Sequence, residues 1–154
     1  MSVAHADSAA SVSWVEHQTL EHIKGALLVT LDWRAPAVGQ ARRKSSIAFT
    51  LQSFCRHLER VMAIEEHDGY LEVVTEANPC LEKKLRTLGG EHDQFRARMR
   101  DLALRLEAVE DWDNEGFDDV CTGIRQLLAD VSRHDQAEVR LLQETLTCDE
   151  GGEG

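Results

Sequence analysis

The feature that most constrains this chain is a set of apolar stripes with helical spacing, each interrupted by a histidine or a carboxylate. The clearest stripe repeats apolar residues at steps of three and four from Leu81 to Val109, and His92 is one of its members. This spacing places the side chains on one face of an α-helix. An imidazole or carboxylate buried on that face is costly unless it is paired or bound to a metal. The pattern therefore indicates helices that share a polar site in their core.

The sequence predicts four helices, over residues 13–34, 43–77, 79–109 and 115–146. Both prolines, Pro36 and Pro79, fall between these segments, where they do not interrupt a helix. Asn78 followed by Pro79 is typical of a helix start, since asparagine caps and proline suits the first helical position. No segment shows the alternation typical of a strand. We therefore expect an all-α protein, an up-down-up-down four-helix bundle.

The chain has 154 residues, which suits one domain that buries a core without needing a metal or disulfide to fold. We expect a helical domain over 12–147, with disordered tails at 1–11 and 148–154. The formal charge of −11 argues against a nucleic-acid or anionic-membrane partner. No apolar run approaches the roughly 20 residues that span a bilayer. The four cysteines form no C-x-x-C pair, which favours a reducing cytoplasm, and Cys55 and Cys121 are expected as small core residues.

Residue counting tests whether the polar residues of different helices meet. Glu65 and His92 are nearly equidistant from the turn between the second and third helices, and His92 and His134 from the turn between the third and fourth. Because each residue advances a helix by about 1.5 Å, these three side chains are expected at one height in an antiparallel bundle. Glu138 follows His134 by four residues and therefore lies on the same helix face. The four residues together predict a metal site of imidazoles and carboxylates.

Two further histidines are candidate ligands. On the first helix, His22 is placed on one face with four other residues: Val15, Ala26, Val29 and Trp33. The height of His22 stays open between that of His57 and that of Glu65. His57 precedes Glu65 by eight residues, about 12 Å along the axis, so the two cannot bind one atom. Either His57 belongs to a polar layer beside the site, or the second helix is arranged differently. The other histidines lack comparable support: His5, His17 and His67.

Residues next to the candidate ligands leave two further questions open. Glu21, Glu66 and Glu91 are rotated about 100° from the apolar stripes, so they are either solvated or orient a ligating imidazole. Gly89 and Gly90 each weaken the third helix by about 1 kcal/mol relative to alanine. They either allow a close helix approach beside the site or form a soft spot in the helix.

These residues resemble the hemerythrin-like (HHE) family, cation-binding four-helix domains of bacteria. The resemblance rests on the segments Thr19-Leu20-Glu21-His22-Ile23, Ile64-Glu65-Glu66, Gly90-Glu91-His92-Asp93 and Arg133-His134-Asp135-Gln136-Ala137-Glu138. It implies a non-haem iron centre in the bundle core, often a carboxylate-bridged pair. Members of the family bind oxygen, respond to oxygen or nitric oxide, or handle iron. The chain departs from the family pattern at Val61 and Arg96, where additional histidines are usual or frequent.

The resemblance and the residue pattern lead to one expected site and three candidate functions. The expected ligands of a di-iron or mononuclear centre are His22, His57, Glu65, His92, His134 and Glu138. We expect binding or sensing of oxygen or a related small diatomic or peroxide ligand, with a signal to a protein partner of unknown identity. The alternative is a ferroxidase- or peroxidase-like enzyme that uses the same residues, and the scarcity of histidines is the feature that points to it. The third interpretation is a metal-free helical interaction module with a hydrogen-bonded polar layer.

Overall fold

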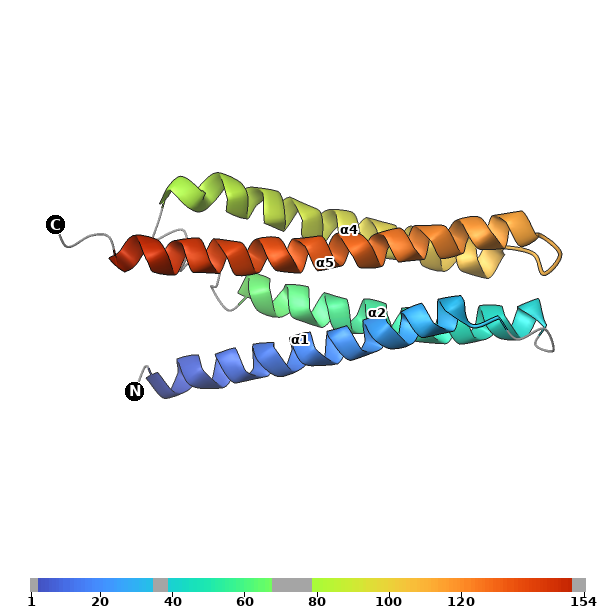
Figure 1. Cartoon of the computed structure of the whole chain (residues 1–154), viewed down its shortest axis with the longest axis horizontal. Helices are drawn as coiled ribbons and strands as arrows, with labels where there is room; N and C mark the ends of the chain where they lie inside the picture. The colour runs from blue at the N-terminus through green and yellow to red at the C-terminus, as the bar shows by residue number, and fades with distance from the viewer. Residues whose placement is uncertain (1–2, 35–38, 68–78, 151–154) are drawn as a thin grey trace.

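The computed structural model describes residues 3–34, 39–67 and 79–150, and its side chains over 15–34, 39–67 and 79–145. Its helices are α1 (Val3–Asp32), α2 (Gln40–His67), the short 3-10 turn η1 (Pro79–Leu81), α4 (Glu82–Ala108) and α5 (Asn114–Glu150). The long helices run alternately along one axis, so the chain goes up, down, up and down (Figure 1). The predicted all-α four-helix bundle is confirmed.

The helix bounds differ from the predicted bounds mainly at the ends. α1 begins at Val3, inside the stretch expected to be a tail, and α5 continues to Glu150. α2 ends at His67, and its expected continuation to residue 77, together with the Asn78 cap, lies outside the described residues. Pro79 opens η1 rather than α4 itself. None of the helices described is both long enough and apolar enough to cross a membrane.

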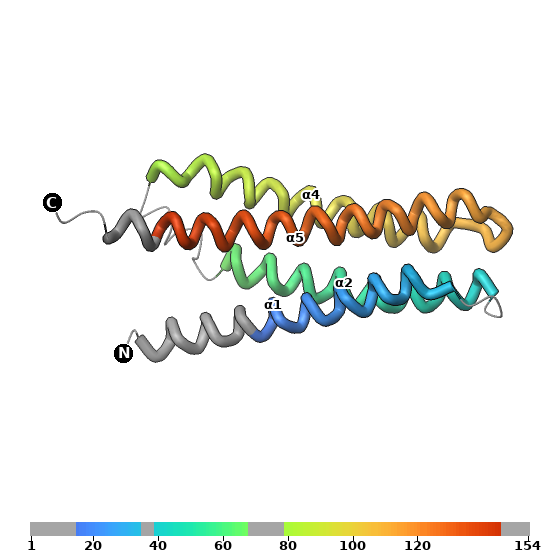
Figure 2. The backbone as a smooth tube through the Cα atoms, viewed as in Figure 1, coloured from blue at the N-terminus to red at the C-terminus, as the bar shows by residue number. Residues whose placement is uncertain are grey.

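The bundle consists of two antiparallel pairs, α1 with α2 and α4 with α5 (Figure 2). α2 also packs against α4, whereas α1 has few contacts with α5. Polar bonds join these last two helices: Lys24 Nζ donates to Ser132 Oγ at 2.8 Å, and Arg125 Nη2 donates to Asp32 Oδ1 at 2.6 Å. The two pairs are therefore held together mainly along the α2–α4 side.

The apolar stripes of α2, α4 and α5 form the core, as their spacing predicts. Most buried apolar residues belong to one long cluster that includes Phe54, Phe117 and Ile124. A separate cluster contains four leucines: Leu81, Leu85, Leu88 and Leu141. Along α4 and α5, the buried histidines lie between the residues of these two clusters. A polar layer thus divides the apolar core.

The predicted register of the first helix is wrong. Its buried side chains are those of Leu20, Leu27 and Leu31. The residues of the predicted stripe are instead exposed at 54%, 69% and 50%: Val15, Val29 and Trp33. Apolar residues occur all around α1, so its periodicity does not select one face. Leu20, Leu27 and Leu31, with the partly buried Ile23, follow each other at steps of three and four and occupy the core.

Candidate metal centre

A group of four buried side chains from three helices forms the candidate metal centre. Glu65 comes from α2, His92 from α4, and His134 and Glu138 from α5. Each offers one ligand atom, and these atoms all lie within 4.8 Å of one another. His92 is 1% exposed and Glu138, the most exposed of the four, is 7% exposed. The structure thus brings together the three residues that residue counting places at one height and Glu138, which follows His134 by one turn.

The inward-facing atoms of the group are close enough to share a cation or a proton. His92 Nε2 lies 3.0 Å from Glu65 Oε2 and 3.1 Å from His134 Nε2. His134 Nε2 in turn lies 2.7 Å from Glu138 Oε1. Two imidazole nitrogens and two carboxylates therefore converge on one small volume.

The outward-facing nitrogens of both imidazoles are held by further carboxylates. His92 Nδ1 lies 2.9 Å from Glu66 Oε1, and His134 Nδ1 lies 2.6 Å from Glu91 Oε2. A carboxylate accepts the Nδ1 proton, which leaves the lone pair of Nε2 free to face the centre. Of the two roles that the sequence left open for Glu66 and Glu91, the structure therefore favours orientation of the imidazoles.

The charges of the centre balance one another. Burial raises the pKa of the Glu65 carboxyl, but hydrogen bonds with His17, His92 and Glu138 outweigh it and lower that pKa. Burial lowers the pKa of His92 and of His134, yet hydrogen bonds with Glu138 and other carboxylates raise both above the ordinary value. The centre therefore stabilises positive charge, as a site for a cation must.

His17 of α1 approaches the same centre, although the sequence analysis set it aside. Its Nε2 atom lies 3.4 Å from Glu65 Oε1, so the two oxygens of Glu65 face different imidazoles. A signal for His17 was present in the sequence. The buried leucine stripe of α1 extends back to it by steps of three and four, through residues 31, 27, 24, 20 and 17.

The structure does not bring the other two candidate ligands into the group. His22 is exposed on α1, because the helix turns its leucine face to the core. His57 is half-buried, and its Nδ1 atom lies 2.9 Å from the carbonyl oxygen of Ser53 in the preceding turn. At the two departures from the family pattern, Val61 is part of the apolar core and Arg96 forms ion pairs.

Asp135 adds a charge that sequence reasoning did not single out. It is half-buried on α5 beside His134. Burial, and then the charge of Glu138, raises the pKa of Asp135 to about 6. A bound cation would relieve this repulsion, so Asp135 adds to the attraction of the centre for positive charge.

The donor set suits a first-row divalent metal. Imidazole binds zinc, copper, iron and nickel, and carboxylate oxygen extends the set toward harder ions. Facing helices of a bundle are also where carboxylate-bridged metal pairs are built, from glutamates and from histidines in helical register with them. His134 and Glu138, four residues apart on α5, provide such a pairing.

Comparisons with known proteins agree with this description of the site. Neither the curated proteins nor the solved structures contain a match to the chain. The model of the hemerythrin HHE cation binding domain matches residues 13–146, which include most of each long helix and every residue of the centre. The chain therefore belongs to the hemerythrin HHE cation-binding domain family.

Proposed function

We propose that the chain binds non-haem iron in this centre and uses it to bind or sense oxygen or a related small oxidant. The observation that carries the proposal is the group of four buried ligand atoms within 4.8 Å of one another. Two imidazoles and two carboxylates lose hydration when they are buried, and a cation compensates for that loss. Membership of a cation-binding family supports the same conclusion.

Each residue of the group would hold the ion through a particular atom. His92 and His134 would bind through Nε2, since their Nδ1 atoms are engaged by Glu66 and Glu91. Glu65 and Glu138 would supply carboxylate oxygens. Bound iron supplies an electron-donating centre with open positions for a small oxidant.

Glu65 supports a centre of two ions rather than one. Its Oε2 atom faces His92 at 3.0 Å and its Oε1 atom faces His17 at 3.4 Å. Glu65 thus lies between two imidazoles, and His17 would add a third imidazole to the residues that would hold two ions. Asp135, whose charge acts on both His17 and Glu138, contributes attraction on that side.

The surrounding side chains limit the access of water. Phe95 packs edge-on against the His134 ring, with 5.3 Å between the ring centroids. Buried Val131 and Leu141 lie one turn or less from the α5 ligands. An apolar enclosure favours a small uncharged ligand such as oxygen over hydrated ions.

The test is the iron content of protein expressed with iron and purified without oxygen. We expect about two iron atoms per chain in the wild type and loss of most of them in His134→Ala. His57→Ala is the matched control, because His57 is a helical histidine outside the group, and it should keep its iron. Wild-type protein without iron would overturn the proposal and favour the metal-free interaction module.

A ferroxidase-like enzyme is the second candidate, favoured by the equal number of carboxylates and imidazoles in the group. The two candidates differ in turnover. A binding or sensing protein consumes oxygen in proportion to the iron it holds, whereas a ferroxidase keeps consuming oxygen when excess Fe(II) is added. Oxygen uptake measured with an electrode separates them.

A further inference from the structure

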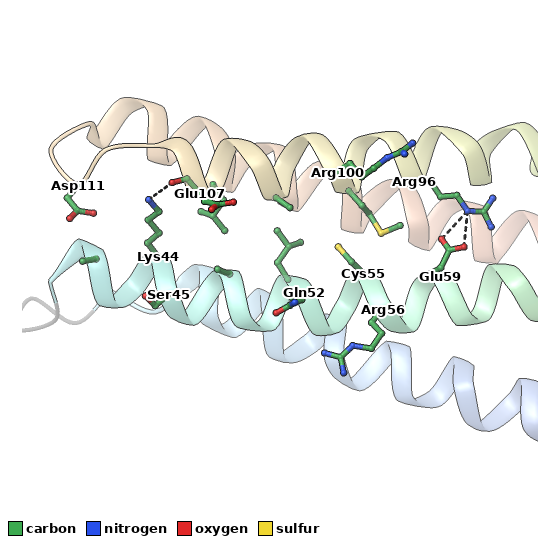
Figure 3. Close-up of a pocket in the computed structure, with 16 residues that line it drawn as sticks. Lys44, Ser45, Gln52, Cys55, Arg56, Glu59, Arg96, Arg100, Glu107 and Asp111 are labelled. Atoms are coloured by element: carbon green, nitrogen blue, oxygen red, sulfur yellow. Dashed lines mark hydrogen bonds and ion pairs between the residues drawn. The ribbon is translucent and has the colours of Figure 1, made fainter.

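One arginine lies beside the metal centre and contacts two carboxylates of α2. Arg96 of α4 is 25% exposed in its side chain and stands at one end of a groove of about 970 Å³ between α2 and α4. Figure 3 shows its guanidinium reaching toward Glu59, with dashed lines for the contacts. Arg96 Nε donates to both Glu59 oxygens at 3.0 Å.

The same guanidinium also holds Glu66. Arg96 Nη2 donates to Glu66 Oε2 at 2.9 Å, and Nη1 lies 2.9 Å from Glu66 Oε1. Glu66 Oε1 is the atom that faces His92 Nδ1 at 2.9 Å. Both oxygens of Glu66 are thereby fixed, and a continuous chain of contacts runs from Arg96 through Glu66 to His92.

The second imidazole lacks this support. Glu91, which holds His134 Nδ1, has no lysine or arginine within ion-pair distance in the part of the chain that the structure describes. His92 and His134 therefore each have a carboxylate at Nδ1. Among the described residues, an arginine holds the carboxylate next to His92 but not the one next to His134.

We propose that Arg96 is a positioning residue that acts through Glu66 to fix the tautomer and ring orientation of His92. The reason is geometric. Glu66 is half-exposed, and a solvated glutamate has several rotamers, of which few place Oε1 against His92 Nδ1. A guanidinium has a planar set of donors that binds one carboxylate at two points and a second carboxylate through Nε. Arg96 thus selects the Glu66 rotamer that holds the Nδ1 proton and turns the Nε2 lone pair toward the centre.

The purpose of this role rests on the proposed function. Its test does not, because it can be carried out on the metal-free protein. Long-range ¹H–¹⁵N spectra of ¹⁵N-labelled protein report the protonation of each histidine nitrogen in the metal-free and zinc-loaded protein. We expect His92 to hold a proton on Nδ1 in the wild type. In Arg96→Met the His92 Nδ1–H signal should weaken through exchange with water, while the His134 Nδ1–H signal stays in place.

Zinc competition titrations provide the second measurement, since outer contacts of metal ligands affect metal affinity by about 10- to 100-fold. We expect Arg96→Met to lower zinc affinity about tenfold and Arg96→Lys to lower it less. In a Glu66→Gln background, Arg96→Met should have little further effect. Arg100→Met is the control, because Arg100 lines the same groove one turn later on α4 and pairs with no described residue.

Each outcome decides between a positioning and a merely structural role. Equal effects of Arg96→Met and Arg100→Met, or an equal effect of Arg96→Met with and without Glu66, would overturn the inference. If Arg96→Met does not fold, Arg96→Lys carries the same comparison. If the wild type binds neither iron nor zinc, the proposed function fails, while the His92 Nδ1–H signal of the metal-free protein still tests the role of Arg96.

Discussion

His92 and His134 meet across the α4–α5 interface with their Nε2 atoms 3.1 Å apart and their ring centroids 4.9 Å apart. Their Nδ1 atoms point outward to carboxylates from α2 and α4. Two Nε2 atoms at this distance cannot both carry a proton aimed at the other, so a second proton either goes to the carboxylate of Glu65 or Glu138 or is replaced by a cation. This relationship makes the centre responsive to both pH and metal.

The first prediction separates the two histidines of α1. His17→Ala should lower the iron content from about two atoms per chain to about one, because His17 faces the free side of Glu65. His22→Ala should leave the content unchanged, since His22 is exposed on the other face. Elemental analysis of both variants checks this. Loss of iron in His22→Ala would contradict the placement of α1.

The second prediction concerns Asp135 in the metal-free protein. Its pKa is raised from 3.8 to about 6 in the folded chain, so the folded state binds this proton more tightly than the unfolded state does. The resulting stability is present below pH 3.8 and is lost as the pH rises through about 6. Asp135→Asn should therefore stabilise the apoprotein by about 1–2 kcal/mol at pH 8 and by little at pH 4.

Urea unfolding of the chelator-treated protein at both pH values measures this difference. Asp119→Asn is the control, because Asp119 is exposed on the same helix. The same Asp135→Asn variant should bind metal less tightly, since it lacks a negative charge beside the centre. A variant that destabilises the apoprotein at pH 8 would refute the electrostatic account.

The third prediction uses the glycines of α4 and α5. A Cβ atom built on Gly90 meets nothing within 4 Å, so Gly90→Ala should stabilise the protein by about 0.5–1 kcal/mol through helix propensity. A Cβ atom on Gly123 would lie 2.8 Å from Leu102 Cδ2, a buried side chain. Gly123→Ala should therefore destabilise the protein, which denaturant unfolding will show. Equal effects of the two substitutions would indicate that α4 and α5 are not packed closely at Gly123.

The fourth prediction concerns the thiol of Cys55, which lines the groove between α2 and α4. Burial raises its pKa from 9.0 to about 11. Because the thiolate is the reacting species, alkylation at pH 8 should be about 100-fold slower than that of a small unburied thiol. Iodoacetamide labelling followed by peptide mass spectrometry measures the rate, with glutathione as the reference. Alkylation as fast as that of glutathione would show that the thiol is open to water.

The sequence predicted the buried residues best for helices that have a single apolar face. On α4, steps of three and four identify the buried residues from Leu81 to Leu106 and place His92 among them. Counting from the predicted turns was sufficient to align Glu65, His92 and His134, because neighbouring antiparallel helices share one height scale. The family and the fold class were predicted from the same residues.

The sequence did not predict the face of α1 or the outer contacts of the centre. Apolar residues all around α1 allow two registers, and the choice between His17 and His22 depends on which leucines pack against the other helices. Likewise, Arg96 reaches Glu66 across 30 positions of sequence. A link of that kind depends on the rotation of α2 and α4 about their axes, which helical periodicity defines to within about one residue.

The segment around Gly90 and Glu91 is another place where the local sequence could not predict the role of its residues. The sequence left open whether the glycine pair brings two helices together, and the empty space around Gly89 and Gly90 shows that no close approach requires them. The glycine pair is therefore a soft point in α4, directly before the turn that bears Glu91 and His92. How far the two glycines loosen this part of α4 depends on the contacts that His92 makes with other helices, and the local sequence does not define those contacts.

The polar layer between the two apolar clusters would affect the stability of the fold as well as the chemistry of the centre, because a bound ion would link distant parts of the chain. One ion bound to Glu65, His92 and His134 would be a reversible cross-link that closes two successive loops of the polypeptide, 65–92 and 92–134. Unlike a disulfide, an ion leaves when the chain unfolds, so it would stabilise the bundle by binding the folded chain in preference to the unfolded one. Because chelators can remove this cross-link, the free energy of unfolding of the bundle would rise and fall with the metal supply.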